Sequence, residues 1–195
     1  MTAQVDRSQL MRRRLLDAAG SAILELGYRG ATAVAICQRA NATRGALHHH
    51  FKNGKIDLMA ALAEEIYEHQ YREHAALAGE SPAHALLQYI DRYLLDDSDS
   101  EQLILVSMWQ ASRDTNEQPL AAALEALRDA HWRRIEQYAP AELAALGKLA
   151  AIFIRGYLME EHLCPPSAAR VDALRLLREL VAAELQKINQ PAALC

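Results

Sequence analysis

Apolar residues recur at steps of three and four positions along most of the chain, which is the spacing of one face of an α-helix. The first stripe occupies residues 15–26, and Gly27 follows it as a residue type that commonly ends helices. Two shorter periodic segments, 32–40 and 43–50, come next and are separated by a short turn that begins with Asn41. Asparagine tolerates the left-handed backbone of a tight turn, so this pattern predicts a helix-turn-helix.

Longer helices are predicted in the rest of the chain. The next one runs from about residue 55 to beyond Tyr71, and residues 96–100 (DDSDS) form a predicted loop. A cap residue or a proline stands ahead of each later periodic run, at Ser81-Pro82, Ser100-Glu101, Gln118-Pro119, Ala139-Pro140 and Pro166-Ser167. The pattern therefore predicts an all-α fold of about nine helices with no strand.

The composition agrees with a compact helical protein and excludes several classes. The chain has 195 residues, of which 51% are apolar and 24% charged, so it can bury a substantial core. Its three cysteines are widely separated and form no CxxC pair, which predicts neither a disulfide framework nor a zinc site and fits a reducing cytoplasm. No apolar run reaches the roughly 18 residues of a membrane span. We therefore expect a cytoplasmic protein that is neither exported nor membrane-spanning.

The net charge of −4 hides an uneven distribution. Residues 1–60 hold nine lysines and arginines against four acids, a net charge of +5, and the remainder therefore carries −9. A basic segment joined to an acidic body indicates a module for polyanions attached to a part with another task.

Three motifs lie between residues 14 and 58, namely LLDAAGSAILELGYRGAT, AICQRANATRGALHHHF and GKIDL. Together they cover about a quarter of the chain and resemble the N-terminal DNA-binding domain of the TetR family of transcriptional regulators. The resemblance implies a three-helix DNA-binding domain at residues 1–54 and a helical ligand-binding and dimerisation domain at residues 55–195. It further implies a repressor that binds a palindromic operator in double-stranded DNA as a homodimer and is released by a small-molecule effector.

Several positions depart from the family pattern. Asn41 stands where the family usually has Gly, Cys37 where it usually has Ala, and His48 where it usually has a Tyr that contacts phosphate. The spacing from the Phe after this helix to the next Lys is four instead of three, as if Gly54 were inserted. His48 and the extra glycine leave open an alternative, a helical small-molecule-binding or scaffold protein that no longer binds DNA.

The second short helix is the expected recognition helix. It must place small or polar residues in the major groove, and Arg44 is its one side chain able to grip guanine O6 and N7 together. Thr32 and Lys55 stand at helix starts, where backbone N–H groups and the helix dipole favour phosphate. Neither Arg44 nor Lys55 is assigned to the core. The predicted DNA contacts are Thr32, Thr43, Arg44, Gly45, Ala46, His48, His49, Lys52 and Lys55.

The acidic body is expected to bind the effector and to dimerise. Aromatic walls with a few polar anchors are typical of pockets in helical bundles. The candidate lining residues are Tyr89, Tyr93, Trp109, Arg113, Trp132 and Tyr157. The last two long helices have apolar faces at close to heptad spacing, which either belong to the core or pair with a twofold copy as a four-helix interface. The predicted interface residues are Phe153, Tyr157, Leu174, Leu177, Val181 and Leu185.

Catalytic and metal-binding patterns are not found in the sequence. Successive helix residues are rotated by about 100°, so the adjacent His48, His49 and His50 cannot converge on one metal ion. There is no HExxH, GxSxG or GxxxxGK motif and no paired-carboxylate arrangement. We therefore expect no enzyme activity, no metal site and no cofactor.

Overall fold

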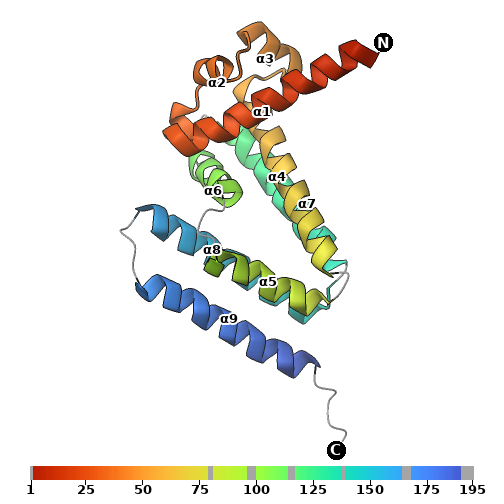
Figure 1. Cartoon of the computed structure of the whole chain (residues 1–195), viewed down its shortest axis with the longest axis vertical. Coiled ribbons are helices and arrows are strands. Elements are labelled where there is room, and N and C mark those ends of the chain that lie inside the picture. Colours follow the sequence, from red (N-terminus) through yellow and green to blue (C-terminus); the bar gives the residue numbers. More distant parts are fainter. Residues whose placement is uncertain are drawn as a thin grey trace, which may run out of the picture. The chain divides into compact units, whose positions relative to one another are not determined.

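The structure, a computed structural model, describes residues 2–78, 81–95, 100–113, 117–137, 139–163 and 168–189. All regular secondary structure in these ranges is helical, which confirms the predicted all-α class (Figure 1). The helices are α1 (Thr2–Gly30), α2 (Ala33–Arg39), α3 (Arg44–His50), α4 (Lys55–Ala78), α5 (Pro82–Leu95), α6 (Ser100–Ala111), α7 (Gln118–Glu136), α8 (Ala141–Leu163) and α9 (Ala168–Asn189). The predicted loop residues 96–99 and the predicted helix start at 166–167 lie outside the described residues.

The described helices begin close to their predicted start signals. α5 begins at Pro82, α6 at Ser100 and α7 at Gln118. α8 begins directly after Pro140, whose carbonyl oxygen accepts a hydrogen bond from the backbone of the first turn at 2.9 Å. Proline and cap residues act within one turn of the chain, so these starts follow from local sequence.

α1 is interrupted at the residue where the sequence predicts its end. Gly27 has φ of 70° and ψ of 167°, a conformation that is costly for any residue with a side chain. One further turn follows and reaches Gly30, and the backbone N–H of Ala31 donates to the Gly27 carbonyl oxygen at 3.0 Å. The glycine thus ends the long straight part of α1 and directs the chain into α2.

The chain divides into two compact units. The first contains the residues up to Glu68 together with Leu103–Asp129, and the second contains His69–Gln102 and the residues from Ala130 onward. α4, α6 and α7 therefore contribute residues to both units, whereas the predicted functional boundary falls at residue 54. The assignment of DNA binding to residues 1–54 and of the other tasks to residues 55–195 stays a prediction.

One apolar core fills the first unit. The stripe of α1 is buried, and α3 contributes Leu47, which is fully buried, together with Phe51 just beyond its end. The start of α4 adds Leu58 and Met59 to the same cluster, and α6 and α7 add further buried side chains. Leu47 and Phe51 therefore face the core, and α3 is left with an opposite face that points away from it.

Three helices pack together in the second unit. α5 contacts both α8 and α9, and α8 contacts α9, so the three lie side by side in Figure 1. α9 buries Leu174, Leu177 and Val181 in this packing, and Arg178 of α9 forms an ion pair with Asp91 of α5. Among the described helices, none combines the length and apolar character needed to cross a membrane.

Candidate nucleic-acid interface

The helix-turn-helix is held by two threonine caps. The Oγ1 of Thr32 accepts a hydrogen bond from the backbone N–H of Ala35 at 3.1 Å at the start of α2. The Oγ1 of Thr43 accepts one from the backbone N–H of Ala46 at 3.0 Å at the start of α3. Each hydroxyl still has its own hydrogen to donate, so both exposed threonines can cap a helix and bind an outside acceptor at once.

Contacts with other residues of the first unit hold the turn between α2 and α3. Asn41 has φ of 47°, the left-handed conformation predicted for it. The guanidinium of Arg14 in α1 donates to the carbonyl oxygen of Ala40 at the end of α2. The buried thiol of Cys37 lies 3.7 Å from the Thr43 carbonyl oxygen, and burial raises the pKa of this thiol. These contacts hold the start of α3, the predicted recognition helix, against α1 and α2.

The outer face of α3 and the residues that flank it gather most of the predicted DNA contacts. Leu47 points into the core, whereas the DNA-facing candidates are exposed or, for Ala46, half-buried. These candidates are Thr43, Arg44, Gly45, Ala46, His48, His49 and Lys52. A β-carbon at Gly45 would meet only the Thr43 hydroxyl, at 3.7 Å, so the backbone is open to a close approach at this point. None of the described residues gives the Arg44 side chain a hydrogen bond or an ion pair.

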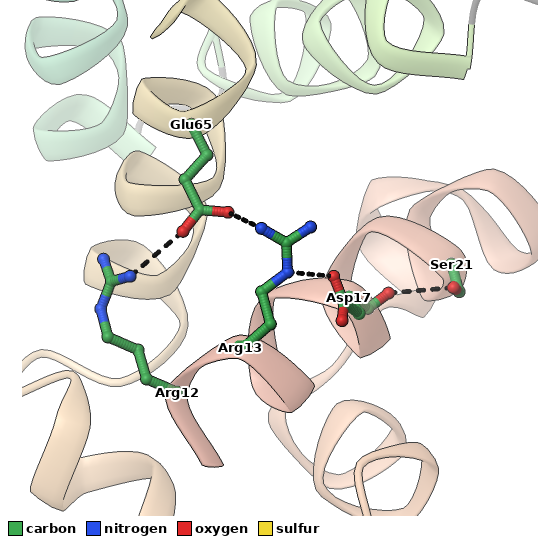
Figure 2. A network of polar contacts seen from close by, with 5 residues as sticks. All are labelled: Arg12, Arg13, Asp17, Ser21 and Glu65. Atoms are coloured by element: carbon green, nitrogen blue, oxygen red, sulfur yellow. Dashed lines mark hydrogen bonds and ion pairs between the residues drawn. The ribbon is translucent and has the colours of Figure 1, made fainter. Parts of the chain in front are cut away.

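Much of the positive charge of the N-terminal segment is neutralised within the first unit. Figure 2 shows the carboxylate of Glu65 in α4 between two arginines of α1. Glu65 accepts from Arg12 Nη1 at 3.1 Å and from Arg13 Nη1 at 3.2 Å, and Arg13 Nε donates to Asp17 at 2.9 Å. Arg39 forms an ion pair with Glu25 in the same unit. The net charge of +5 over residues 1–60 already counts Asp17 and Glu25, so Glu65 is the further acid that reduces it. Arg44 and Lys52 supply the lysine and arginine charge next to α3.

Lys55 has a structural role that its place at the start of α4 does not reveal. Its Nζ donates to the backbone carbonyl oxygen of Tyr28 at 2.8 Å and lies 3.8 Å from the centre of the Tyr28 ring. The Tyr28 hydroxyl in turn donates to Glu117 at 3.0 Å. Lys55 is half-buried, and burial lowers the pKa of its ammonium group. Lys55 thus packs against Tyr28 at the edge of the core, a contact that its place in the sequence does not predict, and a contact between Lys55 and phosphate stays a prediction.

Replacing Lys55 by alanine is expected to lower the free energy of unfolding by about 1–3 kcal/mol, because a charge-assisted hydrogen bond to a partly buried carbonyl is lost. Lys52→Ala is the matched control, since Lys52 is exposed and should change the unfolding free energy by less than about 0.5 kcal/mol. Urea unfolding followed by circular dichroism measures both. Equal stability of Lys55→Ala and the wild type would show that the Tyr28 contact contributes nothing.

The candidate effector residues are spread over both compact units. Tyr89 and Tyr93 of α5 meet edge to face, with ring centres 5.5 Å apart, and Tyr93 is fully buried. Trp132 and Tyr157 belong to the same unit as these tyrosines, whereas Trp109 and Arg113 belong to the first unit. A shallow hollow in the second unit is lined by other residues, Glu136, Ala139, Ala141, Ala144, Ala145 and Lys148. A pocket built from the six candidates stays a prediction.

Sequence reasoning missed four buried polar residues in the second unit. They are Gln70, Gln102, His131 and Arg170. Three of them continue an apolar stripe by one further turn: Gln70 follows Ile66 in α4, His131 follows Leu124 and Leu127 in α7, and Arg170 precedes Leu174 in α9. A polar residue at a stripe position is thus the signal that could have found them. Buried polar groups are candidates for orienting a ligand in a helical unit.

The predicted dimer interface coincides with the core of the second unit. Leu174, Leu177, Val181, Leu185 and Tyr157 are all buried within the chain itself, and Phe153 is half-buried. Of the two alternatives for this stripe, the structure therefore supports the core, because α9 turns the stripe toward α5 and α8. A twofold contact through the same residues stays a prediction, and their burial leaves little of their surface for a second copy.

A second apolar stripe on each of the last two helices is exposed. Leu149 and Ile152 of α8 are 53% and 61% exposed, and Leu176 and Leu180 of α9 are 54% and 61% exposed. Small exposed residues extend both stripes at steps of three and four: Ala145 and Gly156 in α8, and Ala169, Ala173 and Ala183 in α9. This spacing is that of a helix-pairing seam. The apolar surface open to a second copy therefore lies next to the predicted residues.

The N-terminal part of the chain matches a family profile and curated relatives. Residues 15–62 match the profile of bacterial regulatory proteins of the tetR family. Uncharacterized HTH-type transcriptional regulators from Mycobacterium bovis and Mycobacterium tuberculosis are each 39% identical over 82 residues, which is 40% of this chain and 42% of the relative. The match thus spans less than half of the length of these relatives.

Solved structures share the fold over most of the chain. A transcriptional regulator from Rhodococcus sp. Rha1 has a TM-score of 0.68 at 19% identity and covers 89% of this chain and 96% of its own. Thermus thermophilus FadR, a TetR-family transcriptional repressor in complex with lauroyl-CoA, has a TM-score of 0.54 at 16% identity and covers 94% and 98%. The capped helix-turn-helix and the all-α fold place this chain in the class of helix-turn-helix proteins. Within that class, residues 15–62 carry the DNA-binding domain of the tetR family of bacterial regulatory proteins, and the solved structures show that the chain shares its fold with transcriptional regulators.

Proposed function

We propose that this protein is a cytoplasmic, ligand-responsive repressor that binds a palindromic operator in double-stranded DNA as a homodimer. The observation that carries the proposal is the outer face of α3, where Arg44 projects without an intrachain partner among the described residues beside the bare backbone of Gly45. A recognition helix needs this combination, because small residues admit the helix to the major groove and arginine reads guanine.

The residues around α3 supply the contacts that position such a helix on DNA. The capping hydroxyls of Thr32 and Thr43 have a hydrogen left to donate to phosphate oxygens. Lys52 is exposed just beyond the end of α3, where a phosphate contact would be independent of sequence. His49 is exposed on the helix itself and offers an imidazole to the groove. Phosphate contacts fix the register, so the choice of bases is left to Arg44 and its neighbours.

A second copy of the chain is the proposed partner of the exposed stripes on α8 and α9. Leu149, Ile152, Leu176 and Leu180 would leave four large apolar side chains in water in a monomer. One helix-turn-helix reads too short a site to be selective, so a twofold pair of recognition helices is needed for a palindromic operator. A four-helix interface, in which the two stripes pair with their twofold copies, would cover these side chains and supply the second recognition helix.

The second unit is the proposed site of effector binding. The FadR structure that shares this fold is a complex with lauroyl-CoA. In this chain, the supporting features are the paired rings of Tyr89 and Tyr93 and the buried polar side chains of His131 and Arg170. A small, largely apolar molecule is expected to lower DNA affinity through a coupling free energy of about 1–3 kcal/mol.

Selection of bound sequences from random duplex DNA tests the proposed function. The full-length protein should enrich a palindromic sequence, and its affinity for that sequence should fall steeply as salt rises, because binding releases counterions from phosphate. A scrambled duplex of the same length and composition serves as the control. Failure to enrich any sequence, with no salt-dependent binding to either duplex, would favour the alternative of a helical binding or scaffold protein.

A further inference from the structure

His48 and Gly54 are two departures from the family pattern, and the structure places them in contact. A β-carbon at position 54 would lie 3.0 Å from the His48 Cε1 and 3.7 Å from each nitrogen of its ring. A separation of 3.0 Å is tighter than most contacts of a β-carbon, so a side chain at position 54 would push the imidazole aside by a few tenths of an ångström. The His48 ring at its present position therefore favours glycine at position 54, as does the positive φ of that residue.

The turn that presents Gly54 is fixed at both ends. Gly54 has φ of 61°, its N–H donates to the Phe51 carbonyl oxygen at 2.8 Å, and its carbonyl oxygen accepts from Leu58 at 3.1 Å. The backbone N–H and the Nδ2 of Asn53 donate to the Asp57 carboxylate at 2.9 Å and 3.0 Å. These hydrogen bonds hold the turn, which lies against one edge of the imidazole.

The ring is supported by the turn and remains open to solvent. His48 belongs to α3, its side chain is exposed, and its Nδ1 lies 3.5 Å from the Lys52 carbonyl oxygen. The imidazole therefore extends from the recognition helix toward the α3–α4 turn, next to Lys52. A phosphate oxygen of DNA is the acceptor that this arrangement suits, because the ring lies at the end of α3 beside a lysine. Its Nε2, the nitrogen that is not paired with the Lys52 carbonyl oxygen, is the proposed N–H donor.

We propose that Gly54 is a positioning residue that seats the His48 imidazole for a hydrogen bond to a DNA phosphate, so that the inserted glycine and the histidine act as one unit. This inference rests on the proposed function in DNA binding. The shorter reach of histidine, compared with the tyrosine usual in the family, is compensated by a fixed ring orientation. A preorganised donor loses less side-chain entropy when it binds.

A double-mutant cycle on the selected operator tests the proposal. Gly54→Asn keeps a residue that tolerates positive φ but adds a β-carbon against the ring. His48→Ala and Gly54→Asn should each weaken binding by about three- to tenfold, the loss of one hydrogen bond, and the double variant should be no weaker than His48→Ala. Asn53→Ala is the matched control, because it removes one hydrogen bond in the same turn without adding atoms near His48 and should not couple to His48→Ala.

The outcomes separate this inference from the function on which it rests. If Gly54→Asn lowers operator affinity equally in the wild type and in His48→Ala, the inference is overturned while sequence-selective binding stands. Equal coupling of Asn53→Ala and His48→Ala would also overturn it, since general loosening of the turn would explain the cycle. Absence of any selected sequence with the wild type would overturn both proposals. A further test uses the wild-type protein alone. A nuclear Overhauser effect is expected between the His48 Hε1 and the Gly54 Hα protons, and its absence would contradict the proposed position of the ring.

Discussion

Replacing Leu176 and Leu180 together by glutamate is expected to convert the protein from dimer to monomer at micromolar concentration. Each leucine that leaves water at an interface contributes roughly 1.5–3 kcal/mol, and both copies lose theirs in a symmetric dimer. The introduced carboxylates would also face each other across the twofold contact, which adds repulsion. Sedimentation equilibrium measures the mass. Affinity for the palindromic operator should fall by about 10²–10⁴-fold in the same variant, because the second half-site no longer adds to the first.

Arg175→Glu is the matched control for this change. Arg175 is exposed on α9 and pairs with Asp172 of the same helix, and its replacement shifts the charge by as much as the two leucine substitutions do. The control should remain dimeric. Leu177 and Val181 are not suitable for the test, because they are buried inside the chain and a glutamate there would unfold the second unit. A dimer that survives the double leucine substitution would place the interface elsewhere.

Sequence alone predicts the features of this fold that depend on near neighbours in the chain. The Thr32 cap, the left-handed Asn41 and the break at Gly27 each follow from the residue type and one turn of context. The starts of the later helices follow from proline and cap residues in the same way. These signals are local, so they do not require knowledge of which helices meet.

The choice between two neighbouring stripes of α9 could not be made from the sequence. Leu174 and Leu177 are three positions apart, and Leu176 and Leu180 are four apart, so both pairs fit one face of a helix equally well. The first pair is nevertheless buried and the second exposed. The two stripes differ by about 100° around the helix, and only the position of α5 and α8 decides which one is buried.

Contacts between residues far apart in the sequence also could not be predicted from the sequence. Arg12 and Arg13 count as free positive charge in the sequence, yet both are held by Glu65, which lies more than 50 positions later in the chain. Lys55 is predicted from its position to contact phosphate, yet its ammonium group donates to the carbonyl oxygen of Tyr28. Charge counts along a sequence record which ions are present and not which of them are already paired, so they overestimate the cations available to DNA.

Replacing Arg44 by alanine is expected to weaken binding to the selected operator by about 1–3 kcal/mol and to relax the choice at one base pair in each half-site. The reason is that Arg44 is exposed at the start of α3 and can bind guanine O6 and N7 together. Repeating the selection from random duplex DNA with the variant measures the relaxed position. The melting temperature should not change, because no described residue forms a hydrogen bond or an ion pair with this side chain.

Lys52→Ala is the matched comparison for Arg44→Ala, since both remove one exposed cation next to α3. A phosphate contact is independent of sequence, so Lys52→Ala should weaken operator and scrambled duplex nearly equally and reduce the salt slope by about one. Arg44→Ala should instead weaken the operator much more than the scrambled duplex. If Arg44→Ala weakens both duplexes alike, then Arg44 is itself a phosphate contact, and the bases must be read by other residues of α3, with Thr43 and His49 the next to replace.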